Sequence, residues 1–589
     1  MGRYWKIVSV VLLFAFYGQA QYIIESTEEL ISLEKLAQEK VFVHHTGPLV
    51  FAGETLYYAY HCFNAQTNRS SEISLIGYVA LVNGQGEIVK EQKIKLEDGM
   101  AQGDFFINTD TPSGNYKLLG YTQWMKNNGL QQVFKDDVVV INPYLVDQSG
   151  LLPNSDADVV ENLADRVVPV DSSVIQLKFN KKIFEPREKI SFQLVNYKDR
   201  LGYGSYTIKI QKKSELPVAP ALNAIQYAEG YRNVSKQINK SVGDSLFLPE
   251  QRGELLYGNV VDDSNGEPIS DAAVVVSIPG PEFLLKFAKT DSHGNFYTYL
   301  RKDYKEPIAI VQVQEMANAK VALKKQPKLD LSGLTFGNFR LRPEFAVLIK
   351  QRSVWNQLEN QFFAVKPDSI LLGTPIDPFD GGLPETIRLD DYTRFPTFQE
   401  TLVELFSFAG YRNGKDGEYI RIAQDFETYN ETYNDFPAII IMDGVFIPDH
   451  GALKSFDARN IESISLIRDQ FMLGGEGYQG MMVITTKDGD YYKDYTPENG
   501  INVEFDKPLP QKNYFRQQYD NEGHTYKQIP DYRSLLFWQP HVELGEGQLE
   551  FECFASDIPG EYEVVVDGFT TYGKPISFYQ TITIQELQN

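Results

Sequence analysis

The histidines are the first candidates for chemistry, because imidazole binds metal ions and transfers protons near neutral pH. The 589-residue chain has seven of them: His44, His45, His61, His293, His450, His524 and His541. No H-E-x-x-H motif is present, and no two histidines are four residues apart, as two ligands on one helix face would be. His44 and His45 are adjacent in a strand-like segment, so their side chains should point to opposite faces. We therefore predict no metal site.

Signatures of nucleophilic and phosphate-binding sites are missing too. The sequence has no G-x-S-x-G elbow and no Walker-type loop. The glycine-rich segment LGGEGYQG, 473–480, lacks the lysine of a phosphate loop, and we interpret it as a turn. Acidic pairs such as Asp377 with Asp380, or Asp488 with Asp490, do not match the calcium loop D-x-[DN]-x-[DN]-G and are typical of solvated turns. We expect a protein that is not an enzyme and has no cofactor.

Cysteine chemistry is limited to Cys62 and Cys553. In LEFECFA, alternation places Cys553 on the same face as Leu549 and Phe551, which indicates a core position. A bridge between the two cysteines, which would tie the first folded domain to the last, is the alternative. Without a disulfide framework, stability must come from packing. An export signal combined with so few cysteines suits a bacterial envelope protein.

Length and charge limit the partners and the architecture. A chain of this length should hold four or five domains, and a net charge of -23 argues against nucleic acid or an anionic lipid surface as partner. The first twenty residues carry Arg3 and Lys6, an apolar run, and a small-x-small site that ends at Ala20. This pattern predicts a cleaved secretory signal, because the apolar run is too short to span a membrane. We expect an exported protein that does not itself span the membrane.

Most of the remaining sequence reads as short strands separated by turns. Ser26 to Lys40 is the exception near the start, with Ser26 as the N-cap of an amphipathic helix. A second helix should begin near Thr397 or Asp391, with Phe398, Leu402, Leu405 and Phe406 as its apolar stripe. The fold class is therefore mainly β: tandem β-sandwiches with one small α/β domain. The predicted segments are 1–20 (signal), 21–40 (helical lead-in), 41–145, 165–250, 253–340 and 497–589 (sandwiches) and 385–492 (α/β domain).

Motifs in four of these segments resemble known families. The text PLVFAGETL followed by SGNYKLLGYT resembles the MG2 domain of bacterial α2-macroglobulin-like proteins, and [FY]-x-P-R-E-K near Pro186 is similar to a second such module. Neither cysteine is followed by the glutamine of a macroglobulin thioester, so a covalent trap is excluded. The segment 253–313 resembles the carboxypeptidase regulatory-like domain, a transthyretin-like sandwich, through G-x-V-x-D-x-x-x-G-x-P-I and T-D-x-x-G-x-F. The text of 497–589 is similar to an Ig-like final sandwich of Bacteroidetes surface proteins.

The stretch from Pro437 to Gly489 carries the most specific resemblance. A strand ending in a D-G turn is followed by IESISLIRD, a glycine-rich turn and VITTKDG, in the order found in the plug domain of SusC-like TonB-dependent receptors. We expected the order strand, short helix, turn, strand, with the helix at Ile461 to Asp469. Only about a hundred residues follow Gly489, without evenly spaced amphipathic strands, so we expect no transport pore in this polypeptide.

The plug resemblance implies a docking role. A plug-type domain without its own barrel can pack on another protein, so we expect a non-enzymatic, outer-membrane-associated scaffold whose plug-like domain docks on an outer-membrane protein. The candidate docking residues are Asp443, Gly444, Gly477, Tyr478, Gln479 and Gly480. Two alternatives stay open: the plug component of a split TonB-dependent receptor, and an enzyme with an unrecognised site.

Overall fold

The computed structural model describes residues 22–152, 170–231, 238, 240–314, 316, 318–371, 373, 376–379, 381–414, 417–424, 435–519 and 528–586. The predicted signal segment, 1–20, lies outside the described residues. The mainly β class with tandem sandwiches is confirmed, and the described strands form four packed units. We call them the N-terminal sandwich, the composite sandwich, the central sandwich and the hairpin domain, in the order in which they appear below.

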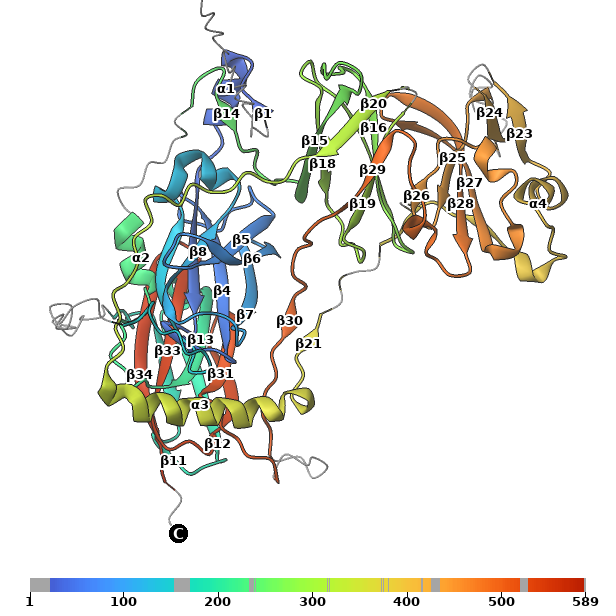
Figure 1. Ribbon diagram of the computed structural model, residues 1–589. Coiled ribbons are helices and arrows are strands. Elements are labelled where there is room, and N and C mark those ends of the chain that lie inside the picture. Colours follow the sequence, from blue (N-terminus) through green and yellow to red (C-terminus); the bar gives the residue numbers. More distant parts are fainter. Residues whose placement is uncertain are drawn as a thin grey trace, which may run out of the picture.

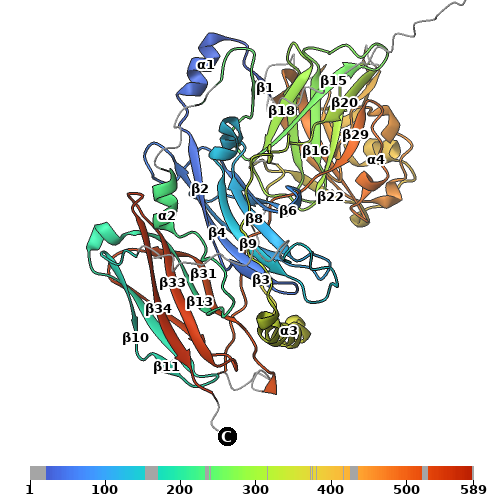
Figure 2. The ribbon, with the colours of Figure 1, turned by 60° about the vertical axis from the view of Figure 1, so that its left-hand side comes forward.

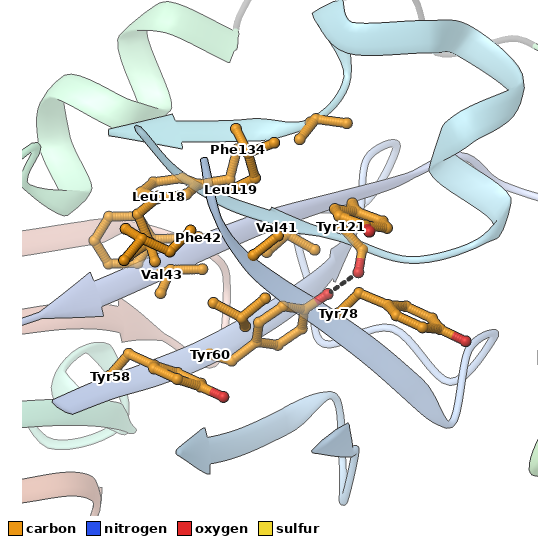
Figure 3. Close-up of a cluster of buried hydrophobic side chains, with 14 of the residues drawn as sticks. Val41, Phe42, Val43, Tyr58, Tyr60, Tyr78, Leu118, Leu119, Tyr121 and Phe134 are labelled. Atoms are coloured by element: carbon orange, nitrogen blue, oxygen red, sulfur yellow. Dashed lines mark hydrogen bonds between the residues drawn. The ribbon is translucent and has the colours of Figure 1, made fainter. Parts of the chain in front are cut away.

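The N-terminal sandwich packs the sheet β2-β4-β7 against the sheet β3-β9-β8-β5-β6. Its strands are β2 (Glu39–His45), β3 (Leu49–Phe51), β4 (Thr55–Asn64), β5 (Ile76–Val82), β6 (Ile88–Lys95), β7 (Met100–Phe106), β8 (Gly114–Tyr121) and β9 (Phe134–Ile141). Aromatic side chains fill the core, and the Tyr60 hydroxyl donates a hydrogen bond to the Tyr121 carbonyl at 2.8 Å (Figure 3). The pairing gives the buried phenol its partner, which a tyrosine needs inside a core.

The helical lead-in is shorter than predicted. Helix α1 covers Thr27–Glu34, and Ser26 caps it by accepting a hydrogen bond from the Glu29 amide at 3.2 Å, as predicted. The chain enters β2 already at Glu39, where strand pairing replaces helical hydrogen bonds.

The composite sandwich corrects the predicted domain order. Segments 165–250 and 497–589 were expected to form two separate sandwiches, but their strands share the sheets β10-β12-β32 and β11-β34-β33-β13-β31. The strands are β10 (Ile175–Phe179), β11 (Ile183–Phe184), β12 (Lys189–Asn196), β13 (Gly204–Lys212), β31 (Leu535–Leu544), β32 (Gln548–Phe554), β33 (Gly560–Thr570) and β34 (Pro575–Ile584). Alternation within each segment predicts strands correctly, but it does not say which distant strand will satisfy their backbone groups.

The central sandwich is also completed by a distant strand. Its sheets are β18-β15-β20 and β17-β16-β19-β29, and β29 follows the hairpin domain in the chain. The strands are β15 (Glu254–Asp262), β16 (Ala273–Ile278), β17 (Leu284–Lys289), β18 (Asn295–Leu300), β19 (Ile308–Val313), β20 (Ala319–Leu323) and β29 (Gly500–Glu504). In sequence, the hairpin domain is therefore inserted between strands of the central sandwich. The central sandwich is in turn inserted between the two sequence segments that form the composite sandwich.

The hairpin domain has the five-stranded sheet β22-β27-β28-β25-β26. Its elements are β22 (Glu385–Arg388), α4 (Phe398–Leu405), β23 (Ala409–Asn413), β24 (Glu418–Ile422), β25 (Ile439–Met442), β26 (Val445–Phe446), β27 (Ile461–Leu473) and β28 (Glu476–Thr486). Thr397 caps α4 by accepting a hydrogen bond from the Glu400 amide at 3.2 Å, one of the two predicted caps.

The predicted helix at Ile461 to Asp469 is wrong. These residues belong to β27, which pairs antiparallel with β28. Ile464 and Leu466 are two residues apart and both are buried on the α4 side of the sheet, which is the alternation of a strand. The isoleucines of this segment are β-branched, which favours the pleated conformation of a strand over a helix.

Two extended segments join the two ends of the molecule (Figure 1). The N-terminal and composite sandwiches form one end, and the central sandwich and the hairpin domain form the other (Figures 1 and 2). Strand β21 (Ser369–Ile370) leads toward the hairpin domain, strand β30 (Lys512–Asn513) returns from the central sandwich, and the two pair antiparallel. Helix α3 (Ala346–Gln361), which the sequence analysis missed, packs on the N-terminal sandwich just before this tether. Its inward face carries Ser353 and Asn356, so apolar periodicity does not reveal it.

Across the described ranges, none of the helices has the length and apolar character needed to cross a membrane.

Candidate functional site

The turn between β25 and β26 is stabilised by the side chain of Asp443, which lies in the turn. Asp443 and Gly444 have φ values of 46° and 87°, the left-handed pair expected of a tight hairpin turn. The Asp443 carboxylate accepts hydrogen bonds from the amides of Thr486, at 2.8 Å, and Tyr491, at 3.0 Å. It therefore ties the turn to the end of β28, which is a structural role.

Gly444 lies directly against the central sandwich. A Cβ at this position would be 2.6 Å from the Cβ of Phe283 and 2.8 Å from the amide nitrogen of Gly280. The Gly280 amide also donates to the Asp443 carbonyl at 3.0 Å. The absence of a side chain allows the two backbones to approach this closely.

Tyr478 and Gln479 on β28 are buried within the chain. Gln314 donates to the Tyr478 hydroxyl at 3.2 Å, and the Tyr478 ring lies 6.3 Å from that of Phe287, centre to centre. The Gln479 side-chain amide donates to the carbonyl of Arg468 at 2.8 Å. These contacts place Tyr478 against the central sandwich and Gln479 inside the hairpin domain.

The two remaining predicted glycines also pack internally. A Cβ at Gly480 would lie 2.7 Å from the Cβ of Ile422, and one at Gly477 would lie 2.6 Å from the ring of Phe436. Three of the six candidate residues, Gly477, Gln479 and Gly480, thus pack within the hairpin domain, while Asp443, Gly444 and Tyr478 meet the central sandwich. The interface core contains Val275, Phe283, Ile439, Ile441, Phe446, Ile467, Tyr478, Met481 and Val483. The sheet of the hairpin domain docks on its own chain here.

A cluster of buried histidines lies where the N-terminal and composite sandwiches meet. His44 contacts Asp567 and His45 contacts Asp136, so the two imidazoles point to opposite faces of β2 as predicted. The rings of His61 and His541 meet edge to face across the interface, 5.3 Å apart centre to centre. Burial lowers the pKa of His541 to about 4 and that of His61 well below its ordinary value. Both rings are therefore neutral at pH 7.

The remaining candidates for chemistry have structural surroundings. Among the described residues, no group of three or more histidine, cysteine or acidic side chains is arranged to hold a metal ion. Asp377 accepts hydrogen bonds from the amides of Phe379 and Gly381, and Asp490 pairs with Lys493 at 3.2 Å. Asp380 lies outside the described residues. Cys62 and Cys553 are both free and buried, the first in the N-terminal and the second in the composite sandwich.

A cleft of about 300 Å³ opens where the N-terminal sandwich, α3, the returning segment after β30 and the edge strand β31 meet. Its aromatic lining includes Tyr57, Trp355, Phe363, Tyr514 and Trp538. No sequence motif joins Tyr57, Tyr514 and Trp538, because Tyr57 lies in the first sandwich and the other two lie in the last quarter of the chain.

Comparisons of the sequence find no matching family model and no matching curated protein. Solved structures give weak likenesses. Escherichia coli α2-macroglobulin activated by porcine elastase aligns with a TM-score of 0.24 and 9% identity over 93% of this chain and 44% of that one. The native E. coli protein gives 0.24 and 9% over 96% and 41%, and Salmonella α2-macroglobulin reacted with methylamine gives 0.23 and 8% over 96% and 41%. This chain spans less than half the length of these proteins. Scores this low carry no conclusion about its function.

Proposed function

We propose that the protein is a non-enzymatic, outer-membrane-associated scaffold that uses the hairpin domain to dock on an outer-membrane protein. The nested chain path supports this proposal. Because the hairpin domain is inserted into the central sandwich, and the central sandwich is reached through the paired segments β21 and β30, the domain is held at both ends. Two connections place a domain at a distance from the rest of the molecule and restrict its movement more than a single flexible linker would.

The docking surface is the outer end of the hairpin domain. One face of its sheet covers the central sandwich, and the other is covered by α4 and the β23–β24 hairpin, which lie at the far end of the molecule (Figure 1). A shallow groove of about 470 Å³ runs beside α4 and is lined by Thr397, Gln399, Glu400, Val403, Glu404, Lys454 and Ser455. Val403 on α4 lines this groove and is 69% exposed, so its side chain is available for contact with a second protein.

Recovery from detergent-solubilised outer membranes tests the proposal. We expect the natural protein to copurify with an outer-membrane protein, and Val403→Glu to reduce this recovery by tenfold or more. Val347→Glu is the matched control, because Val347 is 75% exposed on α3, at the other end of the molecule. Recovery of the natural protein only as a free soluble monomer, or equal loss with both variants, would contradict the proposal.

A further inference from the structure

The cleft beside Tyr514 and Trp538 is lined by several segments of the chain that meet near the paired strands β21 and β30. The N-terminal sandwich contributes Tyr57 and Asp104, helix α3 contributes Arg352 and Trp355, and the returning segment contributes Lys512. A pocket at the junction of domains is a common place for a small ligand, and about 300 Å³ is at the small end of the usual range.

The charged side chains of the cleft neutralise one another. Lys512 lies 2.7 Å from Asp104 and 3.1 Å from Asp368, so one ammonium joins two carboxylates. Arg352 binds both carboxylate oxygens of Glu54, at 2.8 and 2.7 Å.

Two further lining cations are paired as well. Lys366 contacts Glu359, and the guanidinium of Arg533 is bidentate on Asp531, at 2.7 and 2.6 Å. Arg516 is the exception, because its guanidinium donates to the neutral side-chain oxygen of Gln539. At each of the paired side chains an ionic ligand would have to displace a partner already bound, whereas an uncharged ligand would not.

Two buried polar groups of the lining have no hydrogen-bond partner among the residues that the structure describes. They are the indole nitrogen of Trp538 and the hydroxyl of Tyr514. Trp538 is 6% exposed, so its N–H cannot turn to bulk water. An unsatisfied buried donor costs about 1–3 kcal/mol, which makes an acceptor from a ligand the natural partner.

Aromatic rings surround these two donors. The Tyr57 ring meets that of Tyr514 edge to face at 4.9 Å and lies 6.3 Å from that of Trp538, centre to centre. Trp355 and the exposed Phe363 of the segment after α3 add further apolar lining. A ligand that fits such a lining needs apolar C–H groups beside its acceptor oxygens.

We propose that this cleft binds a neutral saccharide of one or two rings. A sugar ring offers C–H faces to the aromatic side chains and hydroxyl oxygens that accept from Trp538 and Tyr514. It carries no charge that would compete with the internal ion pairs. The assignment is independent of the membrane-docking role of the hairpin domain, because the cleft lies at the opposite end of the tether.

Titration of the full-length purified protein tests the assignment. The probes are glucose, galactose, mannose, maltose and cellobiose. Their binding is measured by calorimetry and by intrinsic tryptophan fluorescence. We expect at least one of them to bind. Tyr514→Phe removes only the hydroxyl, and Trp538→Phe removes the indole N–H together with one of the two fused rings, so each should weaken that binding at least about tenfold.

Tyr299→Phe is the matched control, because the Tyr299 hydroxyl donates to Pro249 near the central sandwich, outside the cleft. It should leave the affinity unchanged. Three results would overturn the proposal. The first is that no sugar binds at 10 mM, and the second is that sugars bind equally well to the natural protein and to both cleft variants. The third is that uncharged tetraglycine amide binds and is weakened by the cleft variants, while no sugar binds. Loss of membrane recovery with Val403→Glu would leave sugar binding intact, so the two proposals fail separately.

Discussion

The Nδ1 atom of His44 lies 3.0 Å from a carboxylate oxygen of Asp567, across the interface between the N-terminal and composite sandwiches. The other carboxylate oxygen of Asp567 accepts a hydrogen bond from the Ala224 amide at 2.9 Å, at the start of α2 (Ala224–Gly230). Burial raises the pKa of Asp567 to about 7 and lowers that of His44 well below its ordinary value. The pair therefore shares one proton and links three segments of the chain that are far apart in sequence.

Acid should loosen this interface. The folded-state pKa values of His61 and His541 are lowered by burial, to about 4 for His541, whereas unfolded histidine titrates near 6.5. Their contribution to stability is present above about pH 6.5 and is lost as the pH falls toward 4. Each contributes a slope of about 1.4 kcal/mol per pH unit in that window.

Other buried groups also affect the net sign of this pH dependence. His44 and Asp567 contribute little, because the pair holds one proton in the folded state and, near pH 5, also in the unfolded state. His450 adds to the two histidines, because burial lowers its pKa to about 4 as well. Glu250 opposes them, since burial raises its pKa to about 7 and its contribution is lost as the pH rises. Three histidines against one carboxyl leave stability falling with acid.

Replacement of His61 isolates this effect. Its ring stacks on Phe63 and lies near Phe42 and Phe569, so His61→Phe should fit and should remove a buried nitrogen without a partner. We expect the urea midpoint at pH 7.5 to stay or rise, and the loss of stability between pH 6.5 and 5 to shrink by about 1.4 kcal/mol per pH unit. An unchanged pH slope would contradict this reading of the interface.

Substitutions of Asp567 should separate its hydrogen bonds from its charge. Asp567→Asn keeps an acceptor for the Ala224 amide and should cost at most about 1.5 kcal/mol, whereas Asp567→Ala leaves that amide unsatisfied and should cost about 2–4 kcal/mol. Denaturant unfolding of the two variants measures the difference. Equal costs would mean that the carboxylate does not hold the interface together.

Gly444 should resist substitution because of its surroundings more than its backbone angle. Gly444→Ala forces a Cβ to 2.6 Å from Phe283, while Gly489 has a similar φ, 66° against 87°, and nothing within 4 Å of a Cβ. Gly489→Ala should therefore cost about 1 kcal/mol and Gly444→Ala about 2 kcal/mol more. Limited proteolysis of the central sandwich and hairpin domain, together with unfolding midpoints, compares them. Equal losses of stability in the two variants would mean that the cost comes from the backbone angle alone.

Truncation should reveal the composite sandwich. A chain that ends at Gln511 keeps every strand of the central sandwich but lacks β31 to β34. We expect β12 and β13 to lose amide protection in hydrogen exchange, because their partners among β31 to β33 are gone, and β10 to lose it with them, because among the described strands it pairs only with β12. β15 and β16 should stay protected in the same sample. Full protection of β12 and β13 would show that the first half folds alone.

Local signals in the sequence were enough to predict most strands, the mainly β class and the Ser26 cap, and they limited the second cap to Thr397 or Asp391. Ser26 and Thr397 cap helices because a short side-chain oxygen next to an apolar stripe is a local preference. Adjacent His44 and His45 had to point apart because a strand alternates its faces. The helix predicted at Ile461 failed because apolar residues at short spacing suit both a strand and a helix, and the pairing with β28 decides between them.

Tertiary structure alone decided which strands share a sheet and where the buried polar groups meet. Strand pairing is made by backbone groups that every residue carries, so β12 gives no sign in its sequence that its partner is β32. The same holds for the cleft, where Tyr57, Tyr514 and Trp538 come together only after the chain has doubled back. Residue types determined what each segment could bury, and the nonlocal packing of sheets determined what those residues face.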